Sequence, residues 1–105
     1  MDALTSADDC VALGYEAGTQ VTTGSGNVMI GRYAGGDCVG GTNNTHIGYN
    51  AGSSVTSGGG NLHLGKDSGL TGSPGGNITT ASDLIVLGDE NITASNIQVD
   101  WTVAS

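Results

Sequence analysis

Two histidines, His46 and His63, are the side chains of this 105-residue sequence best suited to metal binding or proton transfer. They stand 17 positions apart, and each precedes an aliphatic residue and a glycine, so a regular repeat would place them in one column. If that column faced the axis of a trimer, six imidazoles would converge, and imidazole is a common transition-metal ligand. No carboxylate recurs in the column. We therefore expect neutral, stacked histidines at an interface, and no metal or other cofactor.

The cysteines and carboxylates give weaker signals. Cys10 and Cys38 form no C-x-x-C pair, and Cys38 stands where other repeats have valine, so we expect two free thiols. The acidic residues lie mostly at expected turns, where Asp satisfies backbone donors, and paired carboxylates act as acid and base only across a cleft. We predict no catalytic residue and no enzyme activity.

An internal repeat positions these side chains. An apolar–X–apolar–Gly unit occurs five times; the first four glycines are spaced by 17 residues, and the fifth follows after 23, with an insertion near 73–76. Four positions after each of the first four glycines stands a second glycine, which is preceded by a small residue. Asparagine recurs at 27, 44 and 61. The predicted turn glycines are Gly14, Gly18, Gly31, Gly35, Gly48, Gly52, Gly65, Gly69 and Gly88.

A 17-residue unit is too short for a helix pair but suits one coil of an all-β, parallel β-solenoid (β-roll). Residues 1–69 are expected to form regular coils, 70–92 a last coil with a short insertion, and 93–105 an extended C-terminal strand. The alternating large residues of each strand are predicted to form the core columns: Val11, Leu13, Val28, Ile30, Thr45, Ile47, Leu62, Leu64, Ile85 and Leu87. A second inward column is predicted at Leu4, Val21, Cys38 and Val55.

The middle residue of each strand would then face outward, and this column is less polar than a solvated surface should be. We predict that it forms the interface of an intertwined or side-by-side homotrimer. The predicted interface residues are Ala12, Met29, His46, His63 and Val86, together with Trp101 of the terminal strand.

The composition excludes several classes of partner. Twenty glycines and a net charge of -8 would by themselves indicate disorder, but the periodicity favours a thin repetitive fold. Arg32 and Lys66 are the two cations, too few to neutralise a nucleic-acid backbone. No run of 18 apolar residues is present, so no membrane insertion is expected. Tyr15, Arg32, Tyr33 and Tyr49 follow the turn glycines, and exposed aromatics there could bind a sugar or serve as ordinary surface.

The segments at 27–35 and 44–52 resemble the repetitive stem of bacteriophage tail fibres and, more distantly, the head repeats of trimeric autotransporter adhesins. Both families imply a trimeric parallel β-solenoid. The stretch from 82–88 through 100–105 resembles the segment that leads into an endosialidase-type intramolecular chaperone, which removes itself at a serine–aspartate junction. That resemblance makes Ser105 a candidate cleavage junction, with an arbitrary boundary as the other explanation.

The resemblance implies a structural component of the virion: a stiff trimeric rod of a tail fibre or tailspike, acting outside the cell in host attachment. Its partners would be two sister chains and a surface glycan or protein receptor. One alternative is a bacterial trimeric adhesin head module. Another is a carbohydrate-active tailspike fragment, which would need a cleft with paired carboxylates.

Overall fold

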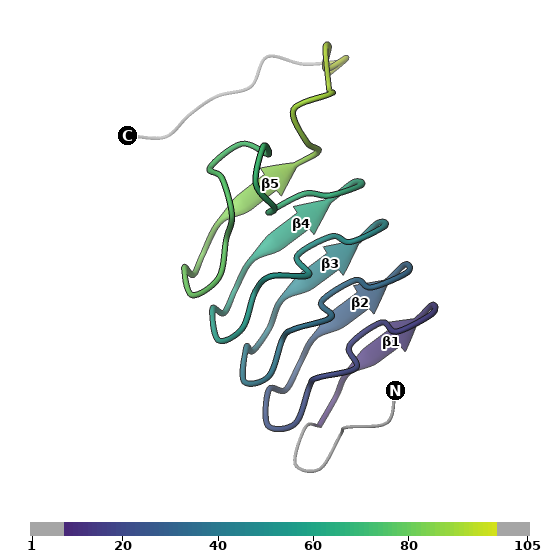
Figure 1. Cartoon of the computed structure of the whole chain (residues 1–105), viewed down its shortest axis with the longest axis vertical. Coiled ribbons are helices and arrows are strands. Elements are labelled where there is room, and N and C mark those ends of the chain that lie inside the picture. Colours follow the sequence, from purple (N-terminus) through teal and green to yellow (C-terminus); the bar gives the residue numbers. More distant parts are fainter. Residues whose placement is uncertain (1–7, 99–105) are drawn as a thin grey trace.

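Five short β-strands stack in parallel along the long direction of the molecule (Figure 1). The structure, a computed structural model, describes residues 8–98. The strands are β1 (Val11–Leu13), β2 (Val28–Ile30), β3 (Thr45–Ile47), β4 (Leu62–Leu64) and β5 (Ile85–Leu87), and they form one sheet in sequence order. Each strand pairs with the residues one coil further on, so Met29 lies beside His46 and His46 beside His63. The predicted parallel β-solenoid with 17-residue coils is confirmed, while the homotrimer stays a prediction.

The glycine turns allow neighbouring coils to approach closely. All nine predicted turn glycines have positive φ. At Gly48, where φ is +134°, an added Cβ would lie 2.7 Å from the backbone carbonyl carbon of Gly65 in the next coil. Backbone hydrogen bonds continue between coils through these turns, for example from the Gly52 amide to the Ser68 carbonyl at 2.8 Å. The prediction of turns at these glycines is therefore confirmed.

The two faces of the sheet are the reverse of the prediction. The middle side chains of the strands point into the coil: Met29, His46 and His63 have no exposed surface, Val86 is buried, and Ala12 is half-buried. These five residues were predicted to form a trimer interface, and that assignment is wrong because they are covered within one chain. Trp101, the sixth predicted interface residue, lies outside the described residues.

The predicted core columns lie on the opposite side, which we call the outer face. It comprises Val11, Leu13, Val28, Ile30, Thr45, Ile47, Leu62, Leu64, Ile85 and Leu87, all of them half-buried or exposed. The assignment of these residues to the core is wrong because the coil interior is narrow. It accepts one large side chain from each strand, and Gly18, Gly35, Gly52 and Gly69 leave the room for it.

The second inward column was placed correctly where the structure describes it. Val21, Cys38 and Val55 have no exposed surface, and the small residues Ala17, Ala34, Ala51 and Ser68 are buried beside them. Leu4 lies outside the described residues. Because the interior contains mainly small side chains, the coil closes with few large apolar residues.

The last coil carries the insertion expected near residues 73–76. The chain leaves the regular path after Gly69 and returns at Ile78, whose amide donates to the Gly69 carbonyl at 2.7 Å. Ile78 is buried in a cluster with Val55 and Val86. Residues 93–98 belong to no strand, and the remainder of the predicted terminal strand, with Ser105, lies outside the described residues. Nowhere in residues 8–98 is there a helix long and apolar enough to cross a membrane.

Candidate functional site

The two histidines form a buried pair inside the coil. Their rings stack 4.9 Å apart at an angle of 13°, and the two Nδ1 atoms are 2.9 Å from each other. One Nδ1 must donate and the other accept, so the accepting ring is neutral. Burial lowers the pKa of His46 to about 3, with the neighbouring His63 as a second cause, and burial also lowers the pKa of His63.

This geometry does not suit a metal. The column that we expected on a threefold axis lies inside one chain, so imidazoles from sister chains cannot converge there. An ion held by both Nδ1 atoms in a tetrahedral site would set them about 3.3 Å apart, since Zn–N bonds are ~2 Å, whereas the two atoms are 2.9 Å apart, at hydrogen-bond distance. Within residues 8–98 no three His, Cys, Asp or Glu side chains gather in a group that could hold a metal ion.

A ladder of buried asparagines supports the same interior. The Asn27 Oδ1 accepts from the Asn44 amide at 2.9 Å, and the Asn44 Oδ1 accepts from the Asn61 amide at 2.9 Å. Each Nδ2 donates to a turn carbonyl one coil further on, as Asn44 does to Gly58 at 2.8 Å. The inward orientation of this asparagine column was not predicted, although its spacing contains the signal. Each asparagine stands two positions before the middle residue of a strand, so both side chains must point to the same side.

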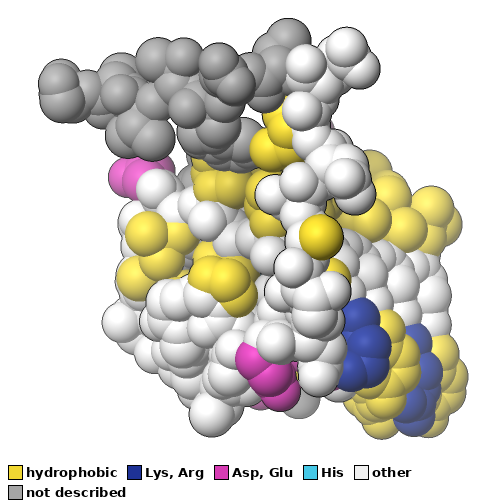
Figure 2. All heavy atoms as spheres, turned by 90° about the horizontal axis from the view of Figure 1, so that it is seen from above, with side chains coloured by type: hydrophobic (Ala, Val, Ile, Leu, Met, Phe, Trp, Pro, Cys, Tyr) yellow, Lys and Arg dark blue, Asp and Glu magenta, His cyan; other side chains and the backbone are white. Residues whose placement is uncertain are grey.

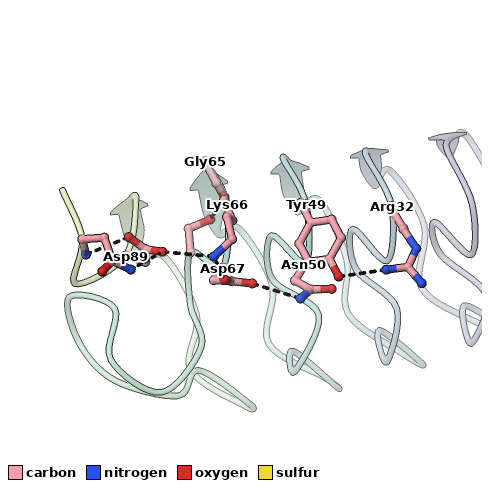
Figure 3. Close-up of polar contacts among 9 residues, drawn as sticks. Arg32, Tyr49, Asn50, Gly65, Lys66, Asp67 and Asp89 are labelled. Atoms are coloured by element: carbon pink, nitrogen blue, oxygen red, sulfur yellow. Dashed lines mark hydrogen bonds and ion pairs between the residues drawn. The ribbon is translucent and has the colours of Figure 1, made fainter.

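The side chains that follow the strands form a second, exposed ladder (Figure 3). The Arg32 guanidinium donates to the Tyr49 hydroxyl at 2.8 Å and lies 4.6 Å from the centre of the Tyr33 ring and 5.5 Å from that of Tyr15. Lys66 occupies the same place one coil beyond Tyr49. Figure 2 shows both cationic side chains at one corner of the molecule, among hydrophobic ones. We call Tyr15, Arg32, Tyr49 and Lys66 the cationic rim.

The end of this ladder is held by ion pairs. Lys66 pairs with Asp67 and lies 3.7 Å from Asp89, and Asn50 donates to Asp67 at 2.9 Å. The bond from Lys66 is the main cause that lowers the pKa of Asp67 and, in return, Asp67 raises the pKa of Lys66. Asp67 is therefore ionised and fully partnered.

Beside this ladder the insertion forms a hollow of about 490 Å³, open to solvent. Its lining residues are Ser54, Asp67, Leu70, Thr71, Asn77 and Glu90. Two carboxylates thus face one hollow, an arrangement that we had not expected from the sequence. The insertion creates it, and the repeat pattern carries no information about the path of an insertion.

The outer face of the sheet is a continuous apolar surface. Leu13 is 59% exposed and Ile85 65% exposed, and none of the ten side chains on this face is charged. The cationic rim borders it at the carboxyl ends of the strands. Asp9 and Asp83, both exposed, stand two residues before β1 and β5 at the amino ends of the strands, and we call them the acidic rim.

The cysteines are unpaired, as predicted. Cys10 is half-buried and Cys38 is fully buried, and burial is the main cause that raises the pKa of the Cys38 thiol. Cys38 therefore acts as a small interior residue rather than a nucleophile.

Comparison with known proteins adds no relative. No family model, no curated protein and no solved structure matches this chain.

Proposed function

We propose that this chain is a structural rod segment of a bacteriophage tail fibre or tailspike, and that it works as a homotrimer in host attachment. The observation that carries the proposal is the outer face, where nine aliphatic side chains form an uncharged strip open to solvent. Burying such a strip is favourable by about 25 cal/mol per Å² of apolar surface, so it favours an assembled state. The resemblance of segments 27–35 and 44–52 to tail-fibre stem repeats supports the same function.

The work of such a rod is mechanical. Every coil is bonded to the next through strand pairs, turn amides and the asparagine ladder, so bending the stack strains all three sets of bonds. A trimer of such stacks presents three equivalent surfaces, and their simultaneous engagement raises the avidity for a host glycan or protein receptor. No step in this function requires bond breaking.

The hollow gives the carbohydrate-active alternative a definite test. Glycoside hydrolysis needs a general acid that is protonated near neutral pH, which means a carboxyl group of raised pKa. Asp67 has the opposite property, because Lys66 and Asn50 hold its pKa below the usual value. Asp67 therefore does not fit the general acid, and hydrolysis in this hollow would require Glu90, the other lining carboxyl group, to serve as that acid.

Light scattering of the purified chain tests the proposal. We expect a species of three times the 10.3 kDa chain mass, and a well-folded monomer at every concentration would contradict the rod assembly. The coding region beyond Ser105 separates the two trimeric functions. A serine–aspartate chaperone there supports the tail fibre, whereas an export signal and an outer-membrane anchor in the same gene would indicate the adhesin head.

A further inference from the structure

The outer face has the dimensions and chemistry of a contact surface. Five strands spaced by ~4.8 Å make it about 20 Å long. Its side chains stand in two straight columns, because the strands pair in register from β1 to β5. Thr45 is the one polar side chain among them. A continuous, uncharged apolar strip of this size on a chain of net charge -8 marks a protein contact.

The spacing of the columns selects the occupant. To fill the grooves between successive strands, a partner must present side chains that repeat at the strand spacing, and another copy of this chain does so. A contact made through uncharged side chains also lets copies of charge -8 approach while their carboxylates stay in water. A second copy therefore fits this face better than a non-repetitive partner.

The two rims select the orientation. Both cations of the chain, Arg32 and Lys66, lie at the carboxyl ends of the strands beside the carboxylates of Glu16, Asp67 and Asp89, whereas the amino ends carry Asp9 and Asp83 and no cation. Rotation about an axis parallel to the coil stack brings the cationic rim of one copy beside the acidic rim of the next. Rotation about the strand direction would instead bring like rims together, with Arg32 near a second cation and Asp9 near a second acid.

We propose that copies of this chain meet through the outer face of β1–β5 with their coil stacks parallel, so that the cationic rim of each copy faces the acidic rim of the next. Tyr15, Arg32 and Tyr49 then border an aliphatic centre, and aromatic and arginine side chains are enriched at protein interfaces. This inference rests on the proposed trimer and adds which surface and which orientation build it.

A charge placed on the outer face tests the surface. Ile47 lies on the central strand and is 38% exposed, so lysine fits there in a single chain; Val39, 45% exposed and outside the strands, is the matched control. We expect Ile47→Lys to keep the circular dichroism of the wild type and to raise the dissociation constant at least 100-fold, while Val39→Lys assembles normally. A folded Ile47→Lys protein that assembles like the wild type would overturn the inference and leave the proposed rod intact. A monomeric wild type would overturn both.

Zero-length carbodiimide coupling tests the orientation, because Lys66 is the one lysine of the chain. Rotation about the stack direction keeps equivalent coils level, and Asp83 lies one coil beyond Lys66, just before β5. We therefore expect covalent oligomers joined between Lys66 and Asp83, identified by mass spectrometry of the junction peptides. The 3.7 Å pair of Lys66 with Asp89 provides the intrachain control. Junctions between Lys66 and Glu16, which lies on the same side as the cationic rim, would overturn the parallel arrangement. So would an absence of intersubunit junctions while the Lys66–Asp89 junction forms.

Discussion

Met29, His46 and His63 are fully buried on the inner face of the sheet, whereas Leu13 and Ile85 on the outer face are more than half exposed. The same three-residue strands thus carry two histidines and a methionine inward, while all but one of their outward side chains are aliphatic. The inner face is limited by space, since each large side chain occupies the room left by a glycine. On the outer face, no other segment of residues 8–98 covers the aliphatic side chains, and Leu13 and Ile85 stay exposed. The difference teaches that, in a narrow solenoid, the volume of a side chain and its hydrogen bonds decide whether it can lie in the interior, and that its hydrophobicity matters less.

The largest loss of stability is expected from a substitution that adds a side chain to the filled interior of the coil. At Gly52, φ is +59° and an added Cβ would fall on the His46 ring. We expect Gly52→Ala to lower the free energy of unfolding by about 4 kcal/mol, from left-handed backbone strain and overpacking. Gly76→Ala is the control, because φ is +75° there but nothing lies within 4 Å; it should cost about 1 kcal/mol. Equal losses in urea unfolding would show that the interior is not tightly filled.

Acid should weaken the inner face selectively. The folded-state pKa of His46 is about 3, below its ordinary 6.5. The unfolded chain therefore binds protons first, so the stabilisation is complete above pH 6.5 and declines as pH falls toward 3. Between pH 7 and pH 4.5 we expect a loss of about 2.5 kcal/mol.

The double variant His46→Met/His63→Met provides the control for this pH effect, since Met29 already occupies the same column. At a fixed protein concentration, urea unfolding of the variant should be nearly independent of pH over that interval. If the wild type and the variant lose the same free energy of unfolding between pH 7 and pH 4.5, the histidines do not cause the acid sensitivity, and protonation of the carboxylates is its cause.

The asparagine ladder tests the hydrogen-bonding part of the comparison. Asn44 accepts from the Asn61 amide and donates to the Gly58 carbonyl, and it is fully buried. Asn44→Ala leaves both groups without a partner and should cost about 2 kcal/mol. The neighbouring Asn43 is exposed with φ of +57°, which glycine adopts freely, so Asn43→Gly should change little. Comparable losses for the two variants would mean that the ladder contributes no stability.

The smallest loss of stability is expected from substitutions in the exposed ladder of side chains that follow the strands. Tyr49→Phe removes the hydroxyl that accepts from Arg32 but keeps the ring beside the guanidinium. Because this bond is exposed to solvent, we expect a loss of about 0.5 kcal/mol. Tyr15→Phe, whose hydroxyl has no partner within residues 8–98, should cost nothing measurable in the same urea titration. A loss above about 2 kcal/mol for Tyr49→Phe would show that this rim is buried in the assembled protein.

Several features of the candidate site followed from sequence alone. The positions of the five strands, the turn glycines and the second inward column of Val21, Cys38 and Val55 were predicted correctly, because each recurs at a fixed spacing. The hollow beside Asp67 and Glu90 was not predictable, since it depends on the path of one insertion. The stacking of Arg32 on three tyrosines was also missed: the spacing placed these residues in neighbouring coils but said nothing of their mutual contacts.

The sequence by itself determined the period, the parallel stacking and the alternation of the strands. Alternation with period two assigns residues to two faces but does not say which face is inside. The tertiary structure decides which face is inside. The side-chain amides of the asparagines reach the turn carbonyls of the next coil. The glycines at 18, 35, 52 and 69 leave space for one large side chain from each strand. Satisfying buried backbone groups and fitting the narrow interior outweigh the burial of aliphatic side chains, which remain available on the outer face.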